Sequence, residues 1–115
     1  MKKLIATCLL ALPLVAPVTA QAQAAWPSKP VRWLVPYPAG GGSDFLARTI
    51  GQQLSTQIGQ PVLVDNKPGG NTAIAAADVV RSAPDGNTVL SADNGTLVFN
   101  PAPYKSLSYS PTKDL

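Results

Sequence analysis

Two glycine-rich segments hold the residues whose types and spacing point most clearly to chemistry. The first runs from Tyr37 to Asp44 and contains three consecutive glycines, and the second runs from Gly69 to Thr72. Glycine lets a backbone turn sharply and come close to a ligand, because it has no Cβ. Each segment precedes a predicted helix, whose first N–H groups lack intrahelical acceptors and lie at the positive end of the helix dipole. We therefore expect backbone donors here to bind a carboxylate or a phosphate.

The candidate binding residues come from three loops. Tyr37 is expected to form an aromatic wall, while Asn94 and Thr96 are expected to donate side-chain hydrogen bonds. Other readings stay open: glycines also serve tight turns, Tyr37 also suits a core or a rim, and turn formation explains Asn94-Gly95 equally well. The complete candidate set is Tyr37, Pro38, Ala39, Gly40, Gly41, Gly42, Ser43, Asp44, Gly70, Asn71, Thr72, Asn94, Gly95 and Thr96.

Asp44 has competing interpretations. A carboxylate in the first turn stabilises a helix, because it faces the positive end of the dipole. The same charge would repel an anion bound nearby. The alternatives are that Asp44 orients the glycine-rich loop or meets an ammonium group on the ligand.

The composition removes most classes of enzyme. The 115 residues include no histidine, no glutamate and a single cysteine, Cys8. Ser-His-Asp and Cys-His pairs, His-ligated zinc and CxxC redox motifs are therefore excluded. We expect no catalysis, no metal and no cofactor. The remaining enzyme hypothesis is a secreted α/β protein that uses Asp44 with Ser43.

Nucleotide binding is the competing use of a glycine-rich loop. The dinucleotide fingerprint needs G-x-G-x-x-G, but Phe45 follows Gly40 and Gly42 at the third glycine position, and the sequence has no Gly-Lys pair for a P-loop. The 9 Lys and Arg residues are scattered among 6 Asp and no Glu. The sequence therefore predicts no nucleic-acid partner.

Residues 1–24 have the three parts of a secretory signal peptide. A basic start, Met1–Lys3, precedes an apolar run, Leu4–Val18, and Ala22-Gln23-Ala24 fits the small-residue cleavage pattern. The apolar run has roughly 15 residues, fewer than the ~20 that cross a bilayer as a helix. We predict cleavage after Ala24, a periplasmic location and a mature chain 25–115 with a net charge of 7 − 6 = +1.

Three predicted strands and two predicted helices must position the loops. β-branched and apolar residues predict strands over Val31–Val35, Pro61–Asp65 and Thr88–Ser91. The second strand is almost wholly apolar, which is typical of a sheet covered on both faces. The first helix is predicted from Ser43 as N-cap to Gly59, and its apolar stripe consists of Leu46, Ile50, Leu54 and Ile58.

The second helix is predicted to begin at Asn71 or Thr72 as its cap. Asp78 and Arg81 are expected to pair on its outer side. Its expected inward residues are Ala73, Ile74, Ala76, Ala77 and Val80. The order strand-helix-strand-helix-strand predicts an α/β fold with a mostly parallel sheet and helices on its faces. All three loops then follow carboxyl ends of strands, where open α/β sheets bind ligands.

Several stretches together resemble a known family. Trp26–Arg32 and Val35–Asp44 are similar to the opening of the Bug family, the periplasmic solute-binding receptors of tripartite tricarboxylate transporters. The similarity continues through Gly59–Val62, Val64–Gly69, Ala83–Gly86, Asn100-Pro101 and Tyr104. The resemblance implies a type II periplasmic-binding-protein fold, whose two lobes close on a small carboxylate. It implies the transporter's membrane components as partners and a monomeric receptor.

The resemblance also assigns roles to the loops. In this family the loop matching Pro38–Ser43 holds a ligand carboxyl group through backbone groups and ordered waters. Loops matching the stretches around Asn71 and Asn94–Thr96 supply further contacts. Family members are longer, so we expect 25–115 to be an incomplete, N-terminal part of the first lobe that binds its ligand weakly or not at all by itself. The alternative is a truncated, non-functional fragment.

Overall fold

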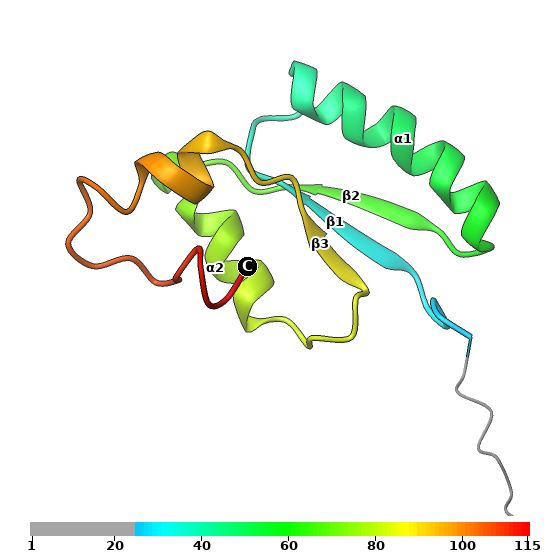
Figure 1. The fold of residues 1–115 in the computed structure, drawn as a ribbon. Helices are drawn as coiled ribbons and strands as arrows, with labels where there is room; N and C mark the ends of the chain where they lie inside the picture. Colours follow the sequence, from blue (N-terminus) through cyan, green and yellow to red (C-terminus); the bar gives the residue numbers. More distant parts are fainter. Residues whose placement is uncertain (1–24) are drawn as a thin grey trace, which may run out of the picture.

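One parallel sheet organises the chain (Figure 1). The structure is a computed structural model that describes residues 25–115, so the predicted signal peptide lies outside the described residues. The strand order is β2-β1-β3, and the register places Trp33 of the central strand between Val64 and Val89. The strands are β1 (Val31–Val35), β2 (Val62–Asn66) and β3 (Thr88–Leu90). The predicted α/β fold with a parallel sheet is confirmed, with shifts of about one residue at strand ends.

The two helices lie on opposite faces of the sheet (Figure 1). They are α1 (Gly42–Ile58) and α2 (Ala73–Arg81). Successive side chains of a strand point to opposite faces. Accordingly, Trp33 lines a pocket together with Ala47 of α1, while its neighbour Arg32 forms an ion pair of 3.0 Å with Asp78 of α2. The central strand is therefore covered on both sides, and Leu34 and Val35 are fully buried.

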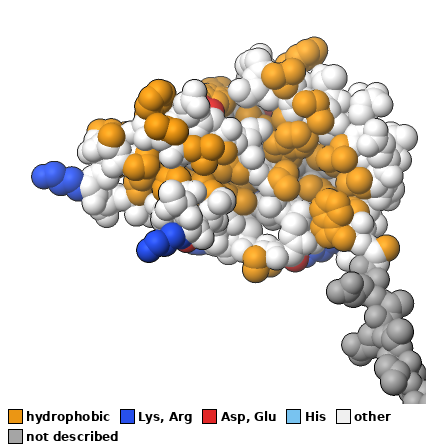
Figure 2. Space-filling view, in the orientation of Figure 1, with side chains coloured by type: hydrophobic (Ala, Val, Ile, Leu, Met, Phe, Trp, Pro, Cys, Tyr) orange, Lys and Arg blue, Asp and Glu red, His pale blue; other side chains and the backbone are white. Residues whose placement is uncertain are grey.

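Helix α1 packs through its smallest residues. Ala47 is buried, and a Cβ placed on Gly51 would lie 3.2 Å from Val62 Cγ1 of β2. The predicted apolar stripe lies beside this contact, because Leu46 is 59% exposed and Ile50 is 50% exposed. The close approach of the helix at alanine and glycine leaves the larger side chains outside the contact. Hydrophobic side chains are accordingly spread over much of the face seen in Figure 2.

The start of α1 differs from the prediction. Ser43 is not the N-cap, because the helix begins at Gly42 and Gly41 occupies the cap position without a side-chain cap hydrogen bond. The predicted end is confirmed, since Gly59 has a φ of 69° and donates its N–H to Ser55 O over 3.1 Å. The end of α1 is thus capped by the backbone, whereas no side chain caps its start.

Three other expectations about packing are wrong. In α2 the expected burial of Ala76 and Ala77 is confirmed, but Ile74 is 51% exposed and Ala75 is buried in its place. Asp78 pairs with Arg32 at 3.0 Å and with Lys67 at 3.2 Å instead of Arg81, because it faces the sheet and the loop after β2. The second strand is not covered on both faces, since Leu63 of this edge strand is 56% exposed.

A short helix follows β3, where the sequence predicted only a turn. The segment η2 (Gly95–Phe99) comes directly after Asn94, and the short turn η1 (Gly70–Thr72) precedes α2. The remaining chain to Leu115 runs beside α2 (Figure 1), where Tyr109 is buried. Among the described residues we find no helix with the length and apolar character required to cross a membrane.

Candidate functional site

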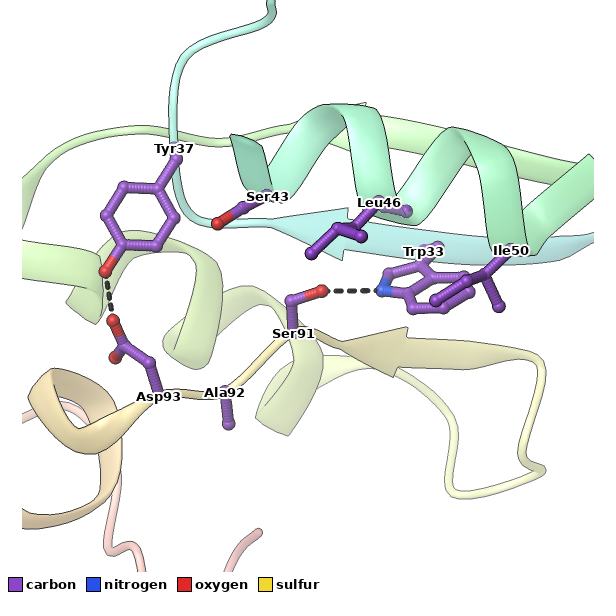
Figure 3. Close-up of a pocket in the computed structure, with 9 residues that line it drawn as sticks. Trp33, Tyr37, Ser43, Leu46, Ile50, Ser91, Ala92 and Asp93 are labelled. Atoms are coloured by element: carbon purple, nitrogen blue, oxygen red, sulfur yellow. Dashed lines mark hydrogen bonds between the residues drawn. The ribbon is translucent and has the colours of Figure 1, made fainter. Parts of the chain in front are cut away.

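A pocket opens at the carboxyl edge of the sheet, where β1, β3 and the start of α1 meet (Figure 3). Its volume is about 270 Å³. Apolar side chains of Trp33, Leu46, Ala47 and Ile50 form one wall, and polar groups gather at the other end. The remaining lining residues are Tyr37, Ser43, Ser91, Ala92 and Asp93. The pocket therefore combines an apolar surface with a polar end next to a helix N-terminus.

The polar end is closed by a contact between two strand ends. The Tyr37 hydroxyl donates a hydrogen bond to the Asp93 carboxylate, which also accepts the N–H of Thr96 over 2.9 Å (Figure 3). Burial alone would raise the pKa of Asp93, but the bonds from Tyr37 and Thr96 outweigh burial and lower it. The same carboxylate raises the pKa of Tyr37. Asp93 is thus ionised and Tyr37 protonated at neutral pH, which keeps the contact formed.

The apolar wall is held in place by one further hydrogen bond. Trp33 Nε1 donates to Ser91 Oγ over 2.8 Å, which joins β1 to the segment after β3 (Figure 3). The bond satisfies the one polar group of the indole and fixes the plane of the ring. Trp33 therefore presents a rigid surface to the pocket.

Asp44 folds the glycine-rich loop back onto its own helix. The buried carboxylate accepts the N–H of Gly40 over 2.8 Å and the Nε of Arg48 over 3.1 Å. These two hydrogen bonds lower the pKa of Asp44 to about 2, and the bond from Arg48 has the larger effect. Of the competing interpretations, this geometry fits the one in which Asp44 orients the loop. Its charge is balanced by Arg48, so repulsion of a nearby anion is reduced.

Arg48 also ties the loop to the neighbouring strand. Its Nη2 donates to Asn66 Oδ1 over 2.9 Å, and Asn66 Nδ2 donates to the carbonyl oxygen of Tyr37 over 3.0 Å. Asn66 ends β2, and Tyr37 follows β1. The glycine-rich loop is therefore held from both sides, although it contains three consecutive glycines.

The start of α1 has backbone N–H groups without intrahelical acceptors, and Ser43 of this turn lines the pocket. Phe45 N–H donates to Gly41 O over 2.9 Å, whereas the amides at 42–44 come too early in the helix to have an intrahelical acceptor. The Ser43 side chain points into the pocket (Figure 3). A Cβ placed on Gly42 would meet no atom within 4 Å, so the space beside the backbone is open. These amides can receive an anion at the positive end of the helix dipole.

The second and third loops form a different structure from the one expected. The Thr72 and Thr96 side chains are buried, and their hydroxyl oxygens lie within hydrogen-bonding distance of each other, 2.8 Å apart. Asn71 Nδ2 donates to Asn100 Oδ1 over 2.5 Å, while Asn94 is exposed. Of the candidate residues, Tyr37 and Ser43 line the pocket, whereas Asn71, Thr72 and Thr96 belong to an adjoining polar cluster. Ligand contact at these positions stays a prediction.

Sequence reasoning missed several residues of the pocket. Asp93 comes shortly after the predicted third strand, Thr88–Ser91, and could have been found from its position, because it follows that strand as Tyr37 follows the first. Trp33 is harder to find from the sequence. Side chains of a central strand point to both faces of the sheet, so its position in the strand does not show that it lines a pocket. The remaining omissions are Leu46, Ala47, Ile50, Ser91 and Ala92.

The comparisons with known proteins identify the family. Residues 46–115 match the family described as "Tripartite tricarboxylate transporter family receptor". The chain belongs to this family, and the resemblance carried by its motifs is confirmed. The chain spans about a third of the length of the curated relatives it matches.

One relative and two solved structures illustrate the match. A UPF0065 protein of Bordetella bronchiseptica is 46% identical over 97% of this chain and 32% of its own length. MatC from Rhodopseudomonas palustris, solved with bound malate, is 35% identical, with a TM-score of 0.72 over 77% of this chain and 30% of its own. An R. palustris protein solved with adipate is 36% identical, with a TM-score of 0.71 over 76% of this chain and 29% of its own.

Proposed function

We propose that this chain is the part of a periplasmic solute-binding receptor that holds one carboxylate group of a small organic acid. The observation that carries the proposal is the start of α1, which lacks a side-chain cap and opens beside the pocket. A carboxylate there accepts hydrogen bonds from the amides at 42–44, and the loop before them is fixed by Asp44. The rest of the ligand lies toward the second lobe of the receptor.

The charges around the pocket suit recognition by backbone donors. Among the described residues that line it, none is Lys or Arg, and the nearby carboxylates of Asp44 and Asp93 already have donors. A carboxylate bound at the helix start meets partial positive charge without a full countercharge. Such a site favours small acids that leave again when the receptor opens.

Family membership and the similar structures support the same ligand class. The malate-bound and adipate-bound proteins are dicarboxylate complexes, and both share the fold with this chain. We propose a small carboxylate as the ligand of this chain. We also propose that its partners are the membrane components of a tripartite tricarboxylate transporter. We also propose a periplasmic location, which the predicted signal peptide and the family support.

The enzyme hypothesis has little chemical support. Ser43 lies at the pocket, but the Asp44 carboxylate is bonded to Gly40 and Arg48. A carboxyl group with a pKa of about 2 is a poor general base at neutral pH. We therefore propose binding without turnover.

The test is calorimetry on the complete gene product with malate, adipate and the uncharged diamide of adipate. We expect at least one dicarboxylate to bind and the diamide not to bind. Gly41→Leu should lower the affinity at least 100-fold, because Gly41 has a φ of −80° that accepts any residue while the new side chain crowds the amides. Gln53→Leu adds the same side chain at an exposed position of α1 and should bind as the wild type does. Equal affinity of wild type and Gly41→Leu would contradict the proposal.

A further inference from the structure

The turn before α2 has an unusual backbone. Four consecutive residues have positive φ: Gly69 (118°), Gly70 (55°), Asn71 (48°) and Thr72 (73°). Glycine adopts such values readily, and asparagine does so more often than most residues. A β-branched residue such as Thr72 rarely does, and it keeps this conformation only when the surrounding structure enforces it.

Asn100 contacts both strained non-glycine residues. Its Nδ2 donates to Asn71 O over 2.6 Å and to Thr72 Oγ1 over 3.3 Å, and its Oδ1 accepts from Asn71 Nδ2 over 2.5 Å. The Asn100 side chain is completely buried. The Asn100 side chain, at the end of η2, therefore forms hydrogen bonds with both the backbone and the side chains of the turn.

The same hydrogen bonds continue to the pocket. Thr96 Oγ1 lies 2.8 Å from Thr72 Oγ1 and 3.0 Å from Asp93 Oδ1, and Asp93 binds Tyr37 at the polar end of the pocket. On the other side, the Tyr109 hydroxyl donates to Thr96 O over 2.7 Å and lies 3.3 Å from Asn100 Nδ2. We call Asn71, Thr72, Thr96, Asn100 and Tyr109 the Asn100 cluster.

We propose that Asn100 is a positioning residue, which holds the 69–72 turn and the Asp93 segment in the geometry that receives the ligand. The inference rests on the proposed function and assigns a role to residues outside the pocket. Buried polar groups cost free energy unless they are paired, so an apolar cluster would serve packing alone at least as well. A fully paired cluster instead selects one geometry. If only a fraction of the molecules has this turn geometry, only that fraction can bind the ligand. The apparent dissociation constant for the ligand then rises in inverse proportion to that fraction.

The experiment compares Asn100→Ala with Asn87→Ala in the complete gene product. Asn87 is also buried, but its side chain donates to Asp85 O over 3.4 Å, at the end of β3 opposite the pocket. Two quantities are measured below the unfolding transition: the backbone amide resonances of residues 70–73, and the dissociation constants for malate and adipate. For Asn100→Ala we expect shifted and broadened resonances and an affinity at least about tenfold weaker. For Asn87→Ala we expect neither change, whatever its effect on stability.

Tyr109→Phe provides a second variant that removes only a hydroxyl group. It should shift the 70–73 resonances in the same direction as Asn100→Ala does, but by less. If Asn100→Ala does not fold, Tyr109→Phe tests the positioning role in its place. Unchanged resonances and affinity in the folded variants would overturn the positioning role. Equal effects of Asn87→Ala would show a role in stability alone and would also overturn it. If the wild type binds no carboxylate, the proposed function fails, while the resonances still test whether Asn100 holds the turn.

Discussion

In the proposed anion site, Asp44 acts on the glycine-rich loop and not on the anion itself. Its carboxylate accepts the N–H of Gly40 and is balanced by Arg48, so the glycine-rich loop is pinned while the amides at 42–44 stay open. The pKa of Asp44 lies at about 2, below its ordinary value of 3.8, so folding favours the ionised form. The stabilisation is complete above about pH 4 and is lost as the pH falls through 2.

Replacement of this carboxylate should therefore have a pH-dependent effect. Asp44→Asn is expected to lower the melting temperature at pH 6, because the amide cannot balance Arg48. The difference from the wild type should shrink between pH 4 and pH 2, as the wild-type carboxylate becomes protonated. Thermal unfolding followed by circular dichroism checks this, and a difference that stays constant down to pH 2 would exclude the assigned role.

The sequence allowed some residue-level predictions and not others. The place of Asp44 in the first turn and of Gly59 after the helix end followed from local preferences, and both are confirmed. The cap at Ser43 was wrong, because Gly41 adopts the cap geometry and leaves the serine inside the helix. The partner of Asp78 was wrong as well, because helical spacing favours Arg81 while Arg32 arrives from a strand 46 residues away.

At the scale of elements, α1 depends on the close approach of Gly51 to β2. A Cβ at this position would already lie 3.2 Å from Val62 Cγ1. Gly51→Leu should therefore push the helix from the strand and lower the free energy of unfolding by about 1–3 kcal/mol. Gln52→Leu, at the exposed neighbouring position, is the matched control and should change it by less than about 0.5 kcal/mol. Urea unfolding measures both, and equal stability of the two variants would contradict the packing described.

Hydrophobic periodicity predicted the strands and helices but not the contact face of α1. The pattern ranks Leu46 and Ile50 above Ala47 and Gly51, because it records side-chain hydrophobicity. The helix instead approaches the sheet where side chains are smallest. Leu46 and Ile50 line the pocket as a result, which the stripe alone did not indicate.

At the scale of the whole molecule, the sheet brings distant loops to one edge. The order of strands and helices was sufficient to predict that the segments after β1 and β3 meet there, as Tyr37 and Asp93 do. The Asn100 cluster could not be predicted, because Asn71 and Asn100 are 29 residues apart and no periodic pattern links them. Leu63 of the edge strand β2 is exposed, and we propose that further parts of a receptor of this family pack against this edge.

The most direct test follows the backbone amides of residues 40–44 by NMR while adipate or malate is added to the complete gene product. We predict saturable shifts at Gly42, Ser43 and Asp44 that follow the calorimetric binding curve. The Gly40 amide should change less, because it already donates to Asp44. Saturable binding of either acid that leaves the amides of 42–44 unshifted would contradict the account.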